Sequence, residues 1–218
     1  MAEAESSTDR RCRGRPQLRP DDETRQIIYE AARHEFATNG FAATSTETVA
    51  RRAGVSTKTL YRLIPNKEAL FEAMVSDRLD RFLQAVNLRA ADHDDIEKAL
   101  NAALMACADL SLDPEVVAMQ RMVLQERGKF ADLAETFYRN GIAQTSAALA
   151  RWLRVQVKRG LIELDDAEEA AGMLIGMVAS APQRAAIYGG VPLPSRRQIE
   201  KRVRTCAALF LRGCGVKR

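Results

Sequence analysis

The chain has 218 residues, of which 33 are Lys or Arg, 29 are Asp or Glu and 46% are hydrophobic, enough for one small domain and a larger one with its own core. Basic side chains outnumber acidic ones before Glu68 and after Pro192, whereas acidic side chains predominate between these points. No apolar run reaches the roughly 18 residues that a membrane span needs. The opening MAEAESSTD lacks the apolar stretch of a signal peptide. The sequence therefore excludes a membrane protein and predicts a soluble, cytoplasmic one.

The first segment of unusual composition is RRCRGRPQLRP, residues 10–20, which is basic, contains Gly and Pro, and has no acidic residue. This composition predicts an arm that is disordered in the free protein, and we assign residues 1–20 to it. Arg13 and Arg15 flank a glycine, so this part is narrow enough to lie along the minor groove of A·T-rich DNA. A tail that only improves solubility is the alternative, and the segment alone does not separate the two.

A first helix is predicted from about Asp22 to Asn39, because apolar residues recur at helical spacing and acidic residues stand near its positive N-terminus. Gly40 ends this helix, and Phe41 can fold back on the core. His34 lies beside Glu35, but adjacent helical residues diverge by about 100 degrees. We therefore interpret His34 as a surface residue and not as half of an acid–base pair.

Two further short helices follow, separated by a glycine. The first is predicted to begin at Thr44, which has the T-x-x-E spacing of a capping box with Glu47. Gly54 supplies the left-handed backbone that ends a helix, and Ser56 caps the next helix, residues 57–63. This is the outline of a helix-turn-helix, whose second helix enters the DNA major groove with its N-terminal residues. A three-helix bundle without a DNA partner has similar turns and caps, so spacing alone leaves that alternative open.

The end of this unit is marked by Pro65, which has no N–H and restricts the residue before it. Asn66 can cap a further helix that begins at Lys67. At the start of the preceding helix, Thr57 and Lys58 would be presented to base edges.

The segment FAATSTETVARRAGVSTKTLYRLIPNKEALF resembles the DNA-binding domain of TetR-family transcriptional regulators over about residues 22–75. The resemblance implies that the side chain at the start of the second helix contacts a phosphate, that Tyr61 and the first lysine of the fourth helix hold the DNA backbone, and that the third helix reads bases. The expected DNA-binding residues are Arg13, Arg15, Thr44, Thr57, Lys58, Thr59, Tyr61, Arg62 and Lys67. Lys58 stands where the family usually has a small residue, and Leu63 and Ile64 replace the usual His and Phe, so the operator sequence does not follow.

The helical period continues from Lys67 to about Val86, which predicts one long helix that leaves the DNA-binding domain, residues 21–67, and enters a larger domain, residues 68–218. A shared helix can transmit motion between the two. After a polar break, the sequence predicts helices over residues 96–110, 114–127, 130–159 with an interruption near Asn140 and Gly141, 165–188 and 196–211. No segment alternates like a strand, so we predict an all-α chain.

Residues 118–178 resemble the C-terminal domains of AefR-like TetR regulators, a match that rests on Phe130, Leu133, Ala134, Phe137, Tyr138, Gly141, Leu149, Gly160, Leu161, Ala170 and Ala171. This resemblance implies a homodimer, with the last two long helices at the interface, and a ligand pocket in each subunit. Small residues that let helices approach closely fit such an interface, but they also fit a contact within one chain. They are Gly172, Gly176, Ala179 and Ser180.

Methionine and aromatic side chains adapt to irregular apolar ligands, which makes those of the larger domain candidates for a pocket. The candidates are Met105, Met119, Met122, Val123, Phe137, Tyr138, Trp152, Met173 and Met177. Taken singly, each of them fits an ordinary core position better than a pocket. Four polar residues of the same predicted helix can orient a polar group of a ligand, and the sequence does not show which of them point inward. They are Gln120, Arg121, Gln125 and Glu126.

The sequence thus predicts a dimeric regulator, most simply a repressor, that binds a palindromic DNA operator and is released by a small apolar or amphipathic effector. A constitutive or architectural DNA-binding protein without an effector is the alternative. An enzyme is not expected, because there is no nucleophile–base pair, phosphate-binding loop or set of metal ligands. The four cysteines include no C-x-x-C pair and the two histidines stand alone, so neither a zinc site nor a disulfide framework is indicated. No metal and no cofactor are predicted.

Overall fold

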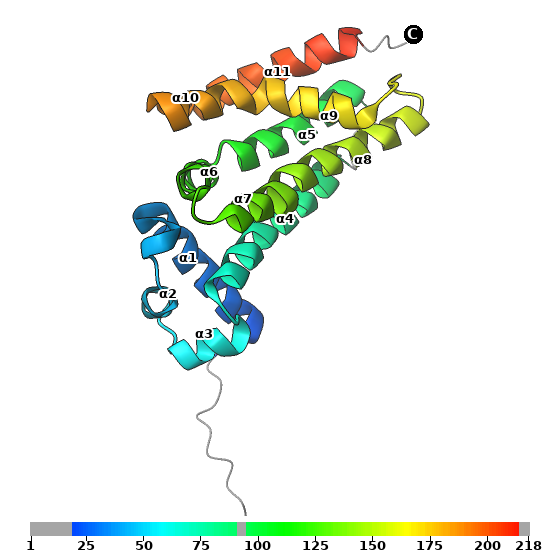
Figure 1. Cartoon of the computed structure of the whole chain (residues 1–218). Helices are drawn as coiled ribbons and strands as arrows, with labels where there is room; N and C mark the ends of the chain where they lie inside the picture. The colour runs from blue at the N-terminus through cyan, green and yellow to red at the C-terminus, as the bar shows by residue number, and fades with distance from the viewer. Residues whose placement is uncertain (1–18, 91–94, 214–218) are drawn as a thin grey trace, which may run out of the picture.

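The computed structural model describes residues 19–90 and 95–213, apart from the side chains of residues 85–90. Throughout these residues the chain is all-α, as predicted, and contains no strand. Figure 1 shows a small group of helices at the lower end and a larger stack of helices above it. The small group consists of α1 (Asp21–Ala43), α2 (Thr46–Ala53) and α3 (Thr57–Leu63). None of the helices in the described ranges has the length and apolar character needed to cross a membrane.

One long helix, α4 (Lys67–Ala90), runs from the small group into the stack, as the apolar period predicted. The stack then contains, in chain order, α5 (Ile96–Ser111), α6 (Pro114–Glu126), α7 (Ala131–Phe137), η1 (Tyr138–Ala143), α8 (Gln144–Lys158), α9 (Ala167–Ile175), η2 (Gly176–Ser180), α10 (Ala181–Gly189) and α11 (Arg196–Gly213). In Figure 1, α11 lies along the top with α9 and α10 beneath it, and α4 crosses the lower part. The last helices therefore form the face farthest from α3.

The first helix bends at Gly40, where the sequence predicted its end, because this glycine adopts a φ of +79°. The bend turns Phe41 back onto the bundle, where its side chain is fully buried. Its ring lies 5.3 Å from that of Phe36, 6.0 Å from Phe71 of α4 and 5.2 Å from Phe130 before α7. Aromatic pairs at these distances stabilise a core beyond the area that they bury. Phe41 thus joins the small group of helices to the stack.

The second helix is capped by Ser45 and not by Thr44, so the predicted cap was wrong. The Ser45 hydroxyl accepts the Thr48 N–H at 3.1 Å, and the Ser45 N–H donates to the Thr48 hydroxyl at 3.1 Å. Thr44 instead follows α1 as its C-cap and donates its hydroxyl hydrogen to the Gly40 carbonyl at 2.7 Å. Burial of the phenylalanine after the bend draws Thr44 inward, and the S-x-x-T spacing then supplies the reciprocal cap.

The turn between α2 and α3 follows the prediction. Gly54 is left-handed, with φ +65° and ψ +29°, and its N–H is bound by carbonyls at the end of α2. The Ser56 hydroxyl accepts the Thr59 N–H at 3.0 Å and begins α3. The Asn66 side chain accepts the Ala69 N–H at 2.7 Å and begins α4. These caps satisfy N–H groups that a helix start leaves without partners.

Two apolar cores hold the described residues together. One lies in the stack between α4, α5, α8, α9, η2 and α11, around buried side chains such as Leu100, Leu153 and Leu174. The other fills the small group and continues into α6 and α7 through Met122 and Leu133. Because the second core crosses the boundary placed after residue 67, the division into two domains at that point stays a prediction.

Two π-helical segments interrupt the helices of the stack. The first, η1, falls where the sequence predicted an interruption, near Asn140 and Gly141. The second, η2, lies within a stretch predicted as one helix, residues 165–188, which the structure divides into α9, η2 and α10. Single turns of π-helix occur frequently at functional sites. A cavity beside either segment is therefore a candidate functional site.

The left-handed glycine of the turn gives a direct test of the fold. Gly54→Ala should lower the free energy of unfolding by about 1–2 kcal/mol, since a Cβ disfavours this backbone conformation although no atom lies within 4 Å of it. Gly128→Ala is the matched control, because its added Cβ also meets open space but its φ is not positive. Urea denaturation of both variants measures the difference, and equal effects would contradict the role of the turn.

Candidate functional site

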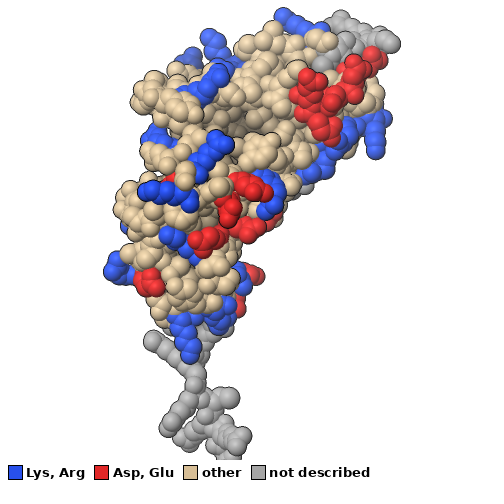
Figure 2. All heavy atoms as spheres, in the orientation of Figure 1, with Lys and Arg blue, Asp and Glu red and all other residues tan. Residues whose placement is uncertain are grey.

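The helix-turn-helix is assembled on a buried face. Val49, Ala50 and Ala53 of α2 are buried, as are Leu60 and Leu63 of α3. Their packing against α1 and α4 leaves the other faces of α2 and α3 open. Figure 2 shows Lys and Arg side chains around the lower end of the molecule, where Figure 1 places α3, with some Asp and Glu side chains beside them. The basic side chains are of the kind that contacts DNA phosphates.

Two of the predicted base-reading residues are free at the surface. The side chains of Thr57 and Lys58 are exposed in the first turn of α3, and neither makes a hydrogen bond or ion pair with another described residue. Thr59 is partly buried, and its hydroxyl lies 2.8 Å from the Ser56 hydroxyl of the cap. Thr57 and Lys58 are therefore available to a partner, whereas Thr59 supports the start of the helix.

Tyr61 extends from α3 across the start of α2 with 47% of its surface exposed. Its hydroxyl lies 2.6 Å from the Thr46 hydroxyl and donates to a Glu47 carboxylate oxygen at 3.4 Å. Hydrogen bonds from the Glu47 backbone N–H and then from Ser45 lower the pKa of Glu47, so this carboxylate stays charged. Tyr61 thus joins the two helices and also presents a ring to solvent.

Arg62 is engaged within the protein. Its guanidinium donates two hydrogen bonds to the Asp21 carboxylate at 2.7 and 2.8 Å, which ties α3 to the start of α1 and raises the pKa of Arg62. This bidentate geometry fixes the guanidinium. Arg62 stays half-exposed, so a DNA phosphate would have to share it with Asp21.

Lys67 closes the loop between α1 and α2. Its ammonium donates to the Phe41 carbonyl at 2.8 Å and to the Thr44 carbonyl at 3.0 Å, and it lies 4.4 Å from the centre of the Phe41 ring. One N–H remains for a phosphate. The side chain of Thr44 is only 3% exposed, because its hydroxyl is turned inward. The expected contact between this side chain and a phosphate therefore has no support in the structure.

The remaining predicted DNA-binding residues, Arg13 and Arg15, lie outside the described residues. Arg51, near the end of α2, is a further candidate that was not among the expected DNA-binding residues. Its side chain is exposed and has no ion-pair partner among the described residues. Its position on the open face of α2 was readable from the helical period, because the buried positions lie on the opposite side.

A cavity of about 280 Å³ lies in the stack, next to both π-helical segments. Its walls are mainly apolar and come from α4, α5, α6, α7, η1, α8, α9, η2 and α10. Polar side chains are few: Arg78, Ser111, Gln120, Thr145, Ser180 and Gln183. A mainly apolar pocket with a few convergent polar groups is the usual form of a small-molecule site.

Only some of the predicted pocket residues line this cavity. Met119 and Phe137 line it, as does Gln120. Val123 lines a neighbouring surface groove that shares Gln120 and Phe137 with the cavity, and this groove also includes Tyr138. The role of these residues in ligand binding stays a prediction.

The other predicted pocket residues do not line the cavity, so the structure gives no support to their assignment to a ligand pocket. Met122 and Trp152 are buried in the two cores, while Met105 and Met177 pack against the core of the stack. Met173 is 59% exposed on α9. Composition cannot distinguish these environments, because it does not show which side of a helix faces inward. The α4 wall consists of Val75, Arg78 and Leu79, none of which is a methionine or an aromatic residue, so composition does not identify it.

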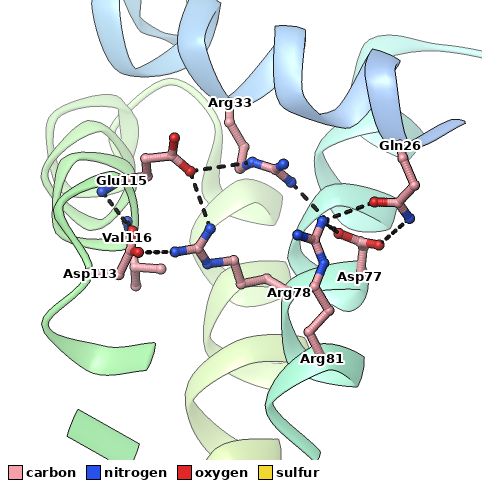
Figure 3. Close-up of polar contacts among 8 residues, drawn as sticks. All are labelled: Gln26, Arg33, Asp77, Arg78, Arg81, Asp113, Glu115 and Val116. Atoms are coloured by element: carbon pink, nitrogen blue, oxygen red, sulfur yellow. Dashed lines mark hydrogen bonds and ion pairs between the residues drawn. The ribbon is translucent and has the colours of Figure 1, made fainter. Parts of the chain in front are cut away.

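An ion-pair network lies beside the cavity and joins α1, α4 and α6 (Figure 3). Arg78 of α4 pairs with Asp113 and, at 3.2 Å, with Glu115 at the start of α6. The same Glu115 oxygen lies 3.4 Å from Arg33 of α1, and Arg33 lies 3.7 Å from Asp77 of α4. The network therefore connects α1, against which α2 and α3 pack, to α4 and α6, which line the cavity.

Two family models match the chain. Residues 28–74 match the model of bacterial regulatory proteins of the tetR family, and residues 98–215 match the C-terminal domain of AefR-like transcriptional repressors. No curated protein sequence matches the chain.

Several solved structures have the same fold. A TetR-family transcriptional regulator from Mesorhizobium loti MAFF303099 is 25% identical, with a TM-score of 0.76 over 89% of this chain and 98% of that one. The flavonoid-responsive regulator FrrA is 28% identical, with a TM-score of 0.67 over 88% and 97%. FadR from Bacillus subtilis, solved with stearoyl-CoA, is 17% identical, with a TM-score of 0.68 over 86% and 98%, and shows the fold alone. With its helix-turn-helix and a C-terminal match that spans more than half of its length, the chain belongs to the TetR family of transcriptional regulators.

Proposed function

We propose that this protein is a dimeric repressor that binds a palindromic operator with one helix-turn-helix per half-site and leaves it when a small molecule binds. Regulators of the family bind DNA and act as dimers, and some respond to small-molecule effectors. The observation that carries the proposal is the first turn of α3, where Thr57 and Lys58 are exposed and unpaired among the described residues. An N-terminal turn of this kind is what a recognition helix presents to the major groove.

Around this turn, the proposed interface has two kinds of contact. Thr57 and Lys58 read base edges, while Tyr61, Arg51 and the remaining N–H of Lys67 contact phosphates. Arg62 contributes to the extent that a phosphate shares it with its acidic partner. We further propose that Arg13 and Arg15, which lie outside the described residues, add minor-groove contacts.

The proposed dimer forms through the face made by α9, α10 and α11. Large apolar side chains are exposed there, including Met173, Tyr188 and Leu209. An apolar surface of this kind is what an interface with another protein chain covers. Of the small residues predicted at this interface, Gly172 is exposed, whereas Ala179 is buried within the subunit. The proposed contact therefore rests on the large apolar side chains more than on the small ones.

The cavity beside η1 and η2 is the proposed effector site. Its apolar walls favour an apolar ligand body, and the amide of Gln120 has no hydrogen-bond partner among the described residues, so it is available to a ligand oxygen. The flavonoid-responsive regulator FrrA, at 28% identity, is an example of a related protein whose name gives an aromatic effector. We therefore propose an effector with an apolar or aromatic body and oxygen substituents.

The proposed mechanism is a shift between two conformations. The ligand favours the one in which α4 is tilted, so that the two recognition helices no longer match half-sites about one helical turn apart. A coupling free energy of about 1–3 kcal/mol between the two sites would weaken DNA binding by about 5- to 150-fold. The long helix α4 contributes to both sites, because it carries Lys67 at one end and lines the cavity through Arg78.

The test of the proposed function is selection of bound sequences from a random duplex DNA pool by the purified protein, followed by a salt titration of the selected site. We expect an enriched site with two inverted half-sites and binding that falls steeply with salt. Salt-sensitive binding without enrichment would favour an architectural protein and overturn the repressor.

Lys58→Ala should change the bases preferred at one or two positions of each half-site, because the side chain faces base edges. Lys158→Ala is the matched control, since it removes the same charge from an exposed lysine at the end of α8. Repeating the selection with both variants measures the effect. Identical preferences for Lys58→Ala and the unmodified protein would remove Lys58 from the base-reading surface.

A simple probe of the proposed effector class is 4-heptylphenol, which has an apolar chain, an aromatic ring and one hydroxyl. Gln120→Ala should weaken its binding by about 3- to 10-fold, the loss expected for one hydrogen bond. Gln125→Ala on the same helix is the control, because Gln125 is exposed and does not line the cavity. Isothermal titration calorimetry measures both affinities. Equal effects of the two substitutions would show that the amide of Gln120 does not contact the ligand.

A further inference from the structure

The polar lining of the cavity includes one charged side chain, Arg78, and this charge is already neutralised. Arg78 lies on α4 at the side of the cavity that faces the start of α6. Its guanidinium pairs with the carboxylates of Asp113 and Glu115, the latter at 3.2 Å. The three side chains are 20%, 26% and 51% exposed, so they are only partly screened by water. A ligand in the cavity meets an arginine that already has two anionic partners.

The pairing of positive with negative side chains extends beyond Arg78 to two further arginines. Arg33 is 7% exposed and lies between Glu115 and Asp77, and Arg81 pairs with Asp77. The complete network thus consists of the arginines Arg33, Arg78 and Arg81 and the carboxylates Asp77, Asp113 and Glu115, whose formal charges cancel. Figure 3 shows these side chains turned toward one another between the three helices. No positive charge in this network is left over for a ligand.

A carboxylate ligand beside Arg78 would lose its hydration and would lie near Asp113 and Glu115, both of which repel it. It could gain Arg78 only by displacing them, which would leave Asp113 without an ion-pair partner among the described residues and Glu115 paired with Arg33 alone. A neutral hydroxyl or carbonyl oxygen carries no such penalty. It can accept hydrogen bonds from the arginine or from the amides and hydroxyls of the lining, such as Gln120 and Ser180.

We propose that the cavity selects neutral, largely apolar ligands with hydroxyl or carbonyl oxygens over carboxylates, and that Asp113 sets this selectivity by holding the charge of Arg78. The inference rests on the proposed function, in which this cavity is the effector site. Asp113 does not line the cavity, so it acts through Arg78 as a positioning residue.

The charge of Asp113 can be removed without removing the helix cap that the same side chain forms. Its Oδ1 atom caps α6 by accepting the N–H groups of Glu115 at 2.8 Å and Val116 at 3.3 Å, while Oδ2 pairs with Arg78. Asn is as good a helix cap as Asp, so Asp113→Asn removes the charge and keeps the cap. Asp166→Asn is the matched control, because Asp166 caps α9 through Glu168 and Glu169 in the same way and no ion pair joins it to another described residue.

The experiment compares two probes of similar shape at pH 7, neutral 4-heptylphenol and anionic 4-heptylbenzoate, by isothermal titration calorimetry with the full chain. The unmodified protein should bind the phenol at least about tenfold more tightly than the benzoate. Asp113→Asn should strengthen benzoate binding by about tenfold, since it leaves a net positive charge on the network, and should change phenol binding by less than about threefold. Asp166→Asn should change neither affinity.

Each outcome has a separate meaning. If the phenol binds but Asp113→Asn leaves benzoate binding unchanged, the selectivity assigned to Asp113 is overturned while the effector site stands. If the unmodified protein binds both probes equally, the selection of neutral ligands is overturned. If neither probe binds to any variant, the effector site itself fails. Should Asp113→Asn not fold, as judged by circular dichroism, Glu115→Gln tests the same balance, because Glu115 is half-exposed and also pairs with Arg78.

Discussion

The burial of one aromatic ring fixes the relation between the DNA-binding helices and the rest of the molecule. Phe41 is placed by the left-handed backbone of Gly40 and packs against rings from α1, α4 and the segment before α7. The same bend brings the carbonyls of Phe41 and Thr44 within reach of the ammonium of Lys67, the first residue of α4. Because the core on this side continues into α6 and α7, the position of α2 and α3 depends on helices of the stack as well as on α4.

Most of the fold could be predicted because the helices of this chain have strong local signals. Apolar periods, Gly54, Ser56 and Asn66 located the helices and the turn within a few residues, and each acts through its neighbours in sequence. The start of α2 could not be predicted in this way. Both T-x-x-E and S-x-x-T spacings are present, and only the burial of Thr44 in the folded protein decides between them.

The two candidate functional surfaces differ in the same way, because only one of them depends mainly on neighbours in sequence. The open turn of α3 follows from sequence, because its exposure is set by the period of one short helix and by a cap. The cavity does not follow, since its wall combines residues from α4 to α10, and membership depends on how those helices are rotated. Met173 and Met119 illustrate this, because they are the same residue type and yet one is exposed and the other lines the cavity. The ion-pair network could not be predicted from the sequence either, since its members lie on three separate helices.

The π-helical turn η1 has a consequence for how this protein can change over evolution. It adds length to a helix whose earlier part supplies Phe137 to the cavity and whose later part supplies Leu149 and Leu153 to the core. A π-helical turn holds about one residue more than an α-helical turn, so deleting one residue there would restore the α-helical repeat and leave the core-facing side of α8 in place. The same deletion in the regular part of α8 would rotate the residues after it by about 100 degrees and turn Leu153 away from the core. The wall of the cavity at η1 can therefore gain or lose a residue during divergence in ligand preference, whereas the regular part of α8 can change only by replacement of side chains.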